Sequence, residues 1–511
     1  MRPRAPLAAF LAAAALAAAG CAASPGPAEE STAAGTGFRA PDSPIVNLRI
    51  VFRTGSIDDP PGLHGLNALT ALMIGAGGTE TLAYDELAET LYPWSASISA
   101  QSDKEVTTVT GRVHRDHLEP FYAIFRDLIL APRFDPADFE RNRDRLRNAV
   151  VSTLRGNDDE ELGKEALNAL LYRGHPYEAP TLGTELGLEA ITLDDVREFH
   201  AQRYTRGNFL AGAGGGYPEG FLARVDTDLR DNLPEGGGEP AELPAPRVLE
   251  GVELLVVEKQ AIATAISIGF PIGLTRADDD FYPLLVANSY FGEHRTFNGL
   301  LMNVMRGQRG LNYGDYSYIE NFIQAGGSRM PVPNIPRRQQ FFSIWIRPVP
   351  HHNAHFALRQ AMRELQRLVE QGLSQEDFEA TRDFLLNYSQ LYVQTTDRRL
   401  GYLMDARFYD SGFLVDEIRA RLPELTVDDV NAAIRRHLRF DDLGVAVVTS
   451  NAEEFVERLL AGEPSPPTYN TAVGEDILAE DAEIIEYPIP FNMERVQIVP
   501  VREMFRDVSA G

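Results

Sequence analysis

The stretch DFERNRDRL at residues 138–146 returns as DFEATRDFL at residues 377–385, 239 positions later. A second pair, ITLDDVREF at 191–199 and LTVDDVNAA at 425–433, keeps the same order at an offset of 234. Chance does not readily place two matches in the same order at nearly the same offset. We therefore expect two copies of one domain in this chain.

Each copy follows the same coarse plan of strands and helices. It opens with an apolar run typical of a strand, IVNLRIVFRTG at 45–55 and TAISIGFPIG at 264–273. A helix, further strands and a long helical pair follow, and Thr192 or Thr426 is then placed to cap another helix with acids in its first turn. The plan predicts two lobes that each combine a sheet with helices.

Changes in composition divide the chain into segments. Three consecutive glycines and four prolines mark an interdomain linker, and a small, polar, Pro/Gly-rich stretch near the start is typical of a flexible tether. The expected segments are a signal peptide at 1–20, a tether at 21–43, an N-terminal lobe at 44–232, a linker at 233–248, a C-terminal lobe at 249–462, and a tail at 463–511 that packs on the body.

The first 24 residues carry an export signal. Two arginines precede an apolar Ala/Leu run that ends in small residues before Cys21, the only cysteine of the chain. This pattern resembles a bacterial lipoprotein signal, which is cleaved before Cys21 and acylated on its thiol. Since Ala22 follows the cysteine, we expect an exported lipoprotein on the periplasmic face, with the outer membrane favoured. The alternative is a plain signal peptide with an incidental cysteine.

The charge balance excludes some partners. Among 511 residues there are 74 acidic and 48 basic side chains, for a formal net charge of −26. Such a surface repels nucleic acid and anionic lipid, so we expect no nucleic-acid partner and contact with a membrane only through the lipid anchor. No segment after the signal is long and apolar enough to span a bilayer.

Three motifs carry a resemblance to a known family. They are VFRTGSIDDPPGLHGL at 51–66, HPY at 175–177 and FNGLLMNVMRGQRGLNYGDYSY at 297–318. Over residues 45–462 the chain resembles the insulinase, pitrilysin and mitochondrial processing peptidase family. The resemblance implies an α+β fold of two homologous lobes, each a mostly antiparallel sheet covered by helices, arranged as a clam-like half of a peptidase chamber.

The zinc motif of that family is missing here. Active members carry His-x-x-Glu-His on a first-lobe helix and a remote glutamate as third ligand. The resemblance places Ala68 and Leu72 at the two histidines, Ala71 at the glutamate and Thr153 at the remote ligand. We therefore expect no metal or other cofactor in this chain. A register shift toward His64 is the alternative, but no Glu-His pair follows it.

Other histidines are spaced closely enough to consider a metal. They are His114 with His117, and the trio His351, His352 and His355. No cysteine and no suitably placed carboxylate completes either group as a metal site, so we expect these to be ordinary surface histidines. His175 and His200 are expected to cap or pack.

The family's other functional pair is retained. Arg306 and Tyr313 match its arginine and tyrosine, seven positions apart, and Gly310 is placed to end the helix between them. A guanidinium and a phenol suit a carbonyl oxygen that becomes an oxyanion. The alternative is that Arg306 pairs with a surface acid while Tyr313 packs in the sheet.

These observations predict the non-zinc subunit of a heteromeric zinc metallopeptidase, inactive alone. It would supply the arginine–tyrosine pair and half of the chamber to a homologous zinc-bearing subunit that cleaves peptides or unfolded proteins. The first alternative is a catalytically inactive structural or peptide-binding homologue. A second, an independent enzyme of other chemistry, lacks support because no phosphate-binding loop, nucleophile motif or thiol outside Cys21 is present.

Overall fold

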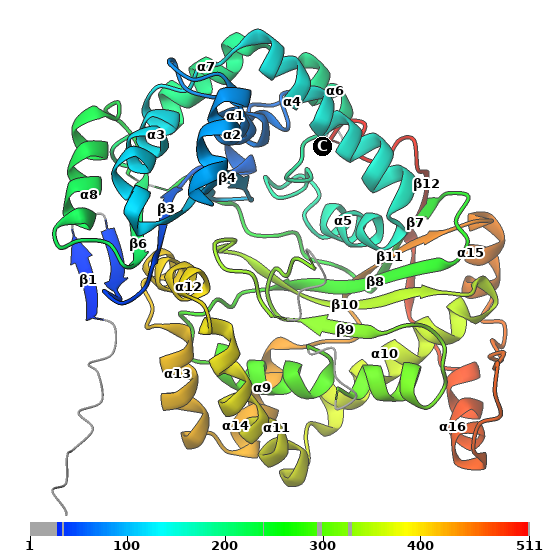
Figure 1. The fold of residues 1–511 in the computed structure, drawn as a ribbon. Coiled ribbons are helices and arrows are strands. Elements are labelled where there is room, and N and C mark those ends of the chain that lie inside the picture. Colours follow the sequence, from blue (N-terminus) through cyan, green and yellow to red (C-terminus); the bar gives the residue numbers. More distant parts are fainter. Residues whose placement is uncertain (1–27, 33–34, 239, 294–298, 325–329, 509–511) are drawn as a thin grey trace, which may run out of the picture.

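The computed structural model describes residues 28–32, 35–238, 240–293, 299–324 and 330–508, which build two six-stranded sheets flanked by helices (Figure 1). The first sheet contains, from edge to edge, β1 (Ala28–Thr32), β2 (Gly35–Arg39), β6 (Phe209–Gly215), β3 (Ile45–Phe52), β5 (Thr107–His114) and β4 (Ser97–Ser102). The second contains β12 (Phe491–Pro500), β7 (Val252–Glu258), β11 (Leu443–Thr449), β8 (Thr264–Ile272), β10 (Gln340–Val349) and β9 (Asp315–Tyr318).

The two sheets share one topology. The order β2-β6-β3-β5-β4 matches β7-β11-β8-β10-β9 position by position. In both sheets the first of these pairs is parallel and the other three are antiparallel. Only the outermost strands differ, because β1 is antiparallel to β2 whereas β12 is parallel to β7. The shared order confirms the predicted α+β fold of two homologous lobes.

The helices repeat as well. The first half has α1 (Leu66–Ala76), α2 (Tyr84–Leu91), α3 (Leu118–Leu130), α4 (Pro136–Asn148), α5 (Asp159–Leu171), α6 (Glu185–Ala190), α7 (Leu193–Arg203) and α8 (Phe221–Asn232). The second half has α9 (Phe281–Phe291), α10 (Ala354–Gln371), α11 (Gln375–Tyr388), α12 (Thr396–Tyr409), α13 (Leu414–Arg421), α14 (Val427–His437), α15 (Ala452–Leu460) and α16 (Glu475–Ile485). The predicted caps are present, since the hydroxyls of Thr192 and Thr426 accept the N–H of Asp195 and Asp429 at 3.2 and 3.3 Å.

The two halves exchange one helix each. Helix α5 of the first half packs on β8 and β11 of the second sheet, and α12 of the second half packs on β2, β3 and β6 of the first (Figure 1). Glycines permit the close approach: a Cβ on Gly444 would lie 3.0 Å from the side chain of Leu170, and one on Gly212 only 2.5 Å from the sulfur of Met404. The sheets therefore depend on both halves of the chain.

The structure differs from the expected flexible tether at residues 28–32 and 35–39. These residues form β1 and β2. The backbone of β2 pairs with β6, and Phe38, 2% exposed, enters an apolar cluster with Leu400 and Met404. The proposed lipidation site, Cys21, lies outside the described residues. No helix in the described part of the chain is both long and apolar enough to cross a membrane.

The C-terminal tail packs back on the body through both lobes. Strand β12 extends the second sheet, and the turn after it reaches α6, where the N–H of Glu185 donates to the carbonyl of Phe505 at 3.0 Å. The preceding stretch IIEYPIP at 484–490 begins with the last two residues of α16.

Candidate functional site

Helix α1 is anchored at its first turn by a buried carboxylate. Asp59 accepts the backbone N–H groups of Gly65 and Asn67, both at 2.7 Å, and burial raises the pKa of Asp59 to about 7. The amide of Asn67 also donates to the hydroxyl of Thr107 at 3.0 Å, which ties α1 to β5. The helix is thus fixed against the first sheet by contacts that require no metal.

The positions of the family's zinc ligands carry no suitable donors. Ala68 is 6% and Ala71 1% exposed within the core, and Leu72 is half-buried on the same helix. Thr153 is exposed in the π-helical segment Ala149–Asn157. Alanine and leucine have no lone pair to offer, and one threonine hydroxyl does not make a zinc site, so these residues do not fit the ion. Across the described ranges, no three His, Cys, Asp or Glu side chains are grouped to hold a metal.

Four other histidines bridge structural elements through backbone carbonyls. Nε2 of His351 lies 3.0 Å from the carbonyl oxygen of Ala261, and Nε2 of His355 lies 3.0 Å from that of Phe455. Burial lowers the pKa of His355 to about 4, so this ring is neutral at physiological pH. His175 and His200 likewise contact backbone carbonyls, as the expectation that they cap or pack implies.

Arg306 and Tyr313 lie together at the end of a helical segment of the second lobe. Arg306 belongs to the π-helical segment Met302–Gly307, and Gly310, at φ +60°, stops it by donating its N–H to the carbonyl of Arg306 at 2.9 Å. The chain then turns, so that the Arg306 guanidinium lies 4.4 Å from the centre of the Tyr313 ring. Tyr313 precedes β9 and is 67% exposed, so it does not pack in the sheet.

A tight turn presents Tyr313 to solvent. The side-chain oxygen of Asn312 accepts the N–H of Gly314 at 3.1 Å, while its amide donates to Asp315 at 2.7 Å and to the carbonyl of Arg347 at 3.0 Å. Asp315 is fully buried, and its second carboxyl oxygen has no hydrogen-bond partner among the described residues. Burial raises the pKa of Asp315 to about 8, against the lowering effect of the Asn312 amide. At neutral pH this carboxyl is therefore mostly protonated.

A second arginine links the tyrosine to the exchanged helix α5. The guanidinium of Arg347 lies 5.4 Å from the Tyr313 ring centre, and its Nε donates to Glu160 at 2.8 Å. Glu160 also lies 3.1 Å from Lys164 on α5. Burial alone would raise the pKa of Glu160, but Lys164 and Arg347 together lower it. The tyrosine is thus flanked by two arginines, of which Arg347 is held by the other half of the chain.

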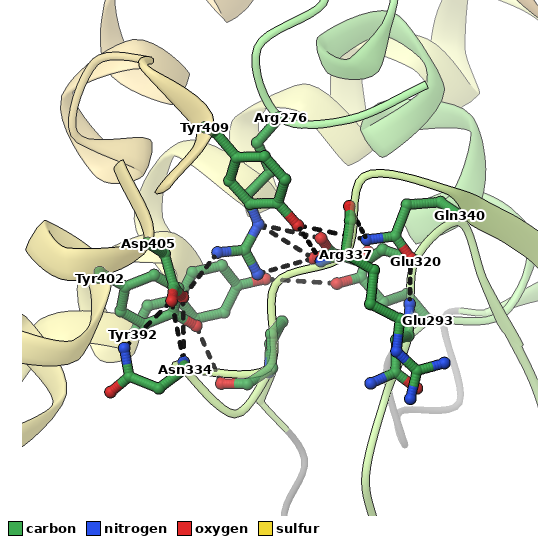
Figure 2. Close-up of polar contacts among 12 residues, drawn as sticks. Arg276, Glu293, Glu320, Asn334, Arg337, Gln340, Tyr392, Tyr402, Asp405 and Tyr409 are labelled. Carbon is green, nitrogen blue, oxygen red and sulfur yellow. Dashed lines mark hydrogen bonds and ion pairs between the residues drawn. The ribbon is translucent and has the colours of Figure 1, made fainter. Parts of the chain in front are cut away.

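A buried polar network joins the lobes and was not predicted from the sequence. Figure 2 shows Arg276 reaching Glu320 with two contacts of 2.9 Å and Asp405 with one of 3.2 Å. Asp405 on α12 in turn accepts the N–H of Asn334 at 2.9 Å. Nearby, Arg337 contacts Asp103 of the first lobe at 2.7 Å. The residues of this polar network come from separate segments without a shared motif, so no local sequence pattern could have identified them.

Comparisons with known proteins agree with this architecture. Residues 39–185 match the family profile described as insulinase (peptidase family M16), and residues 190–385 match the peptidase M16 inactive domain. An uncharacterized zinc protease of Streptomyces coelicolor is 22% identical over 390 residues, covering 75% of this chain and 80% of that protein. A non-peptidase homolog of Helicobacter pylori is 21% identical over 413 residues, covering 80% and 90%.

Solved structures show the same fold. A peptidase M16 inactive domain from Pseudomonas fluorescens superposes with a TM-score of 0.72 at 21% identity, covering 83% of this chain and 98% of that one. A chain of complex III from Candida albicans gives a TM-score of 0.64 at 14% identity, covering 84% and 99%.

Proposed function

The chain belongs to the insulinase family of peptidases, family M16, and from this premise we propose that it is the non-zinc subunit of a heteromeric zinc metallopeptidase. One observation carries the proposal: Arg306 lies 4.4 Å from the ring of an exposed Tyr313, whereas α1 is fully built without any zinc ligand. If the chain had simply lost its activity, nothing would have maintained the arrangement of Arg306 and Tyr313.

The pair suits a carbonyl oxygen on which negative charge develops. A guanidinium and a phenol both donate hydrogen bonds, and fixed donors stabilise such an oxygen more than they stabilise the ground state. An extended substrate is expected to add to β4, which is the edge strand of the first sheet and packs beside α1. The homologous partner would bring the zinc and the rest of the chamber, and alone this chain would cleave nothing.

The second candidate is an inactive structural or peptide-binding homologue. It is favoured by the relative described as a non-peptidase homolog, and the fold also occurs in a chain solved as part of complex III. In that case the exposed tyrosine would contact a bound chain without taking part in hydrolysis.

Co-purification from the native host, followed by metal analysis and a peptide-cleavage assay, separates the two. The proposal expects a zinc-bearing homologue in the complex, no stoichiometric zinc in the isolated chain, and cleavage only by the complex. Arg306→Ala should lower turnover by about 10²- to 10³-fold while the complex stays assembled. Arg145→Ala, at an exposed arginine of α4, is the control. Full activity of the Arg306 variant would leave only the structural role.

We also propose that the mature protein is anchored through an acylated Cys21 on the periplasmic face, in the outer membrane. Mass spectrometry of the mature N-terminus should find a lipid on Cys21, and Cys21→Ser should release the protein from the membrane fraction. An unmodified mature chain starting elsewhere would contradict the anchor.

A further inference from the structure

A cationic cavity opens where the exchanged helix α12 meets the first sheet. It has a volume of about 660 Å³ and is lined by residues from the end of β3, the start of β6, α8 and the end of α12. Four of these residues are arginines. Arg53 follows β3, Arg206 lies in the loop before β6, Arg230 is on α8 and Arg407 is on α12. Because α12 comes from the second half of the chain, neither half forms this cavity alone.

The carboxylates nearby do not neutralise the four guanidinium groups. Arg230 pairs with Asp226 at 2.9 Å, and Arg206 lies 3.5 Å from Glu235, which is itself highly exposed. None of the ion pairs found among the described residues involves Arg53 or Arg407, the two other arginines of the lining. Within the cavity lining itself, the four arginines face a single carboxylate, that of Asp410. A surplus of positive charge is unexpected in a chain whose net charge is −26.

The remaining wall is mixed, because Asn208 and Asp410 contribute polar groups beside apolar side chains. Phe209 and Phe408 line the cavity together with Leu210. A volume of this size holds a ligand of a few residues, and a mixed wall of aromatic and charged groups is typical of small-ligand sites. Guanidinium groups bind carboxylates through paired, charge-assisted hydrogen bonds, which are stronger than neutral ones. The lining therefore matches a ligand with an apolar body and a carboxylate end.

We propose that this cavity binds the C-terminal carboxylate of a short peptide, held by Arg53 and Arg407, with its last side chains against Phe209 and Phe408. The choice of a peptide rests on the proposed function, but the binding does not require a partner subunit. The cavity would then hold one end of a cleaved or extended chain at the seam between the lobes.

Calorimetric titration of the isolated chain tests this directly. The probes are N-acetyl-leucyl-phenylalanine with a free carboxylate and the same dipeptide as its C-terminal amide, at low ionic strength because salt screens such contacts. We expect saturable binding of the acid, weakened about tenfold or more by amidation and by the double change Arg53→Gln with Arg407→Gln. Arg145→Gln, an exposed arginine outside the cavity, should leave the affinity unchanged.

Three results would overturn the proposal: equal binding of acid and amide, no binding of either at millimolar concentration, or displacement of the acid by equimolar inorganic phosphate, which would make the cavity a general oxyanion site. Circular dichroism and the melting temperature confirm that the variants are folded. The titration uses the isolated chain, whereas the cleavage assay uses the complex with its partner. A failed titration would therefore not contradict the proposed role in cleavage, and a failed cleavage assay would not contradict peptide binding in the cavity.

Discussion

The guanidinium of Arg306 lies 4.4 Å from the centre of the Tyr313 ring, although the two residues are separated by a helix end and a tight turn. An exposed contact of this kind contributes only about 0.5–1 kcal/mol, which is too little to explain the turn by itself. The geometry is instead imposed by Gly310, Asn312 and Asp315, so the pair is in place before any partner binds.

The hydroxyl of Tyr313 is expected to matter for turnover but not for stability. Tyr313→Phe keeps the ring under Arg306 and removes only the hydroxyl donor, so the melting temperature should stay unchanged while kcat of the complex falls about 10- to 10³-fold. Tyr92→Phe, at an 87% exposed tyrosine of the first lobe, is the matched control. Unchanged kcat in the Tyr313 variant would remove the hydroxyl from the chemistry.

Returning the family's acidic residue to α1 should damage the fold. Ala71 is 1% exposed, so Ala71→Glu places an unpaired carboxylate in a packed core and is expected to cost about 2–4 kcal/mol of unfolding free energy. Thr153→Glu, at an exposed position, should change stability by less than about 0.5 kcal/mol. Urea denaturation measures both, and similar stabilities would mean that the core around Ala71 tolerates charge.

The buried contact between Arg337 and Asp103 should hold the lobes together. Arg337→Gln leaves a carboxylate in the interior that is 3% exposed, and we expect a loss of about 3–5 kcal/mol. Arg458→Gln breaks an ion pair to Glu463 whose two side chains are about half exposed, and should cost less than about 1 kcal/mol. Equal effects in chemical denaturation would show that the interlobe pair is dispensable.

Asp315 should make stability fall as the pH rises. Its pKa is raised from 3.8 to about 8 in the folded chain, so its contribution is fully present below 3.8 and is lost as the pH rises through 8. Asp315→Asn removes this titration, and its melting temperature should decline less between pH 6.5 and 8.5 than that of the natural chain. Glu293→Gln, at another buried carboxyl with a pKa of about 8, should flatten the same profile independently. Parallel profiles for all three proteins would contradict the assignment.

Much of the fold could be predicted because its signals are local. The hydroxyls of Thr192 and Thr426 cap α7 and α14 by accepting an N–H three residues further along the chain. The apolar runs at 45–55 and 264–273 contain the matching strands β3 and β8. The proximity of Arg306 and Tyr313 likewise depends on a short span of chain with a glycine stop at Gly310. Such features are fixed by backbone geometry over a few residues.

The sequence by itself determined that the domain is duplicated, that α1 lacks zinc ligands and that Arg306 and Tyr313 share one turn. The tertiary structure alone decided that α5 packs on the second sheet and α12 on the first, and that residues 28–32 and 35–39 enter the first sheet. It also decided that the buried Arg276 and Arg337 pair with the distant carboxylates of Asp405 and Asp103. The sequence of a helix shows that its apolar face must be buried, but it does not show which sheet buries it. That choice depends on contacts hundreds of residues apart, such as Leu170 against Gly444, which leave no local pattern.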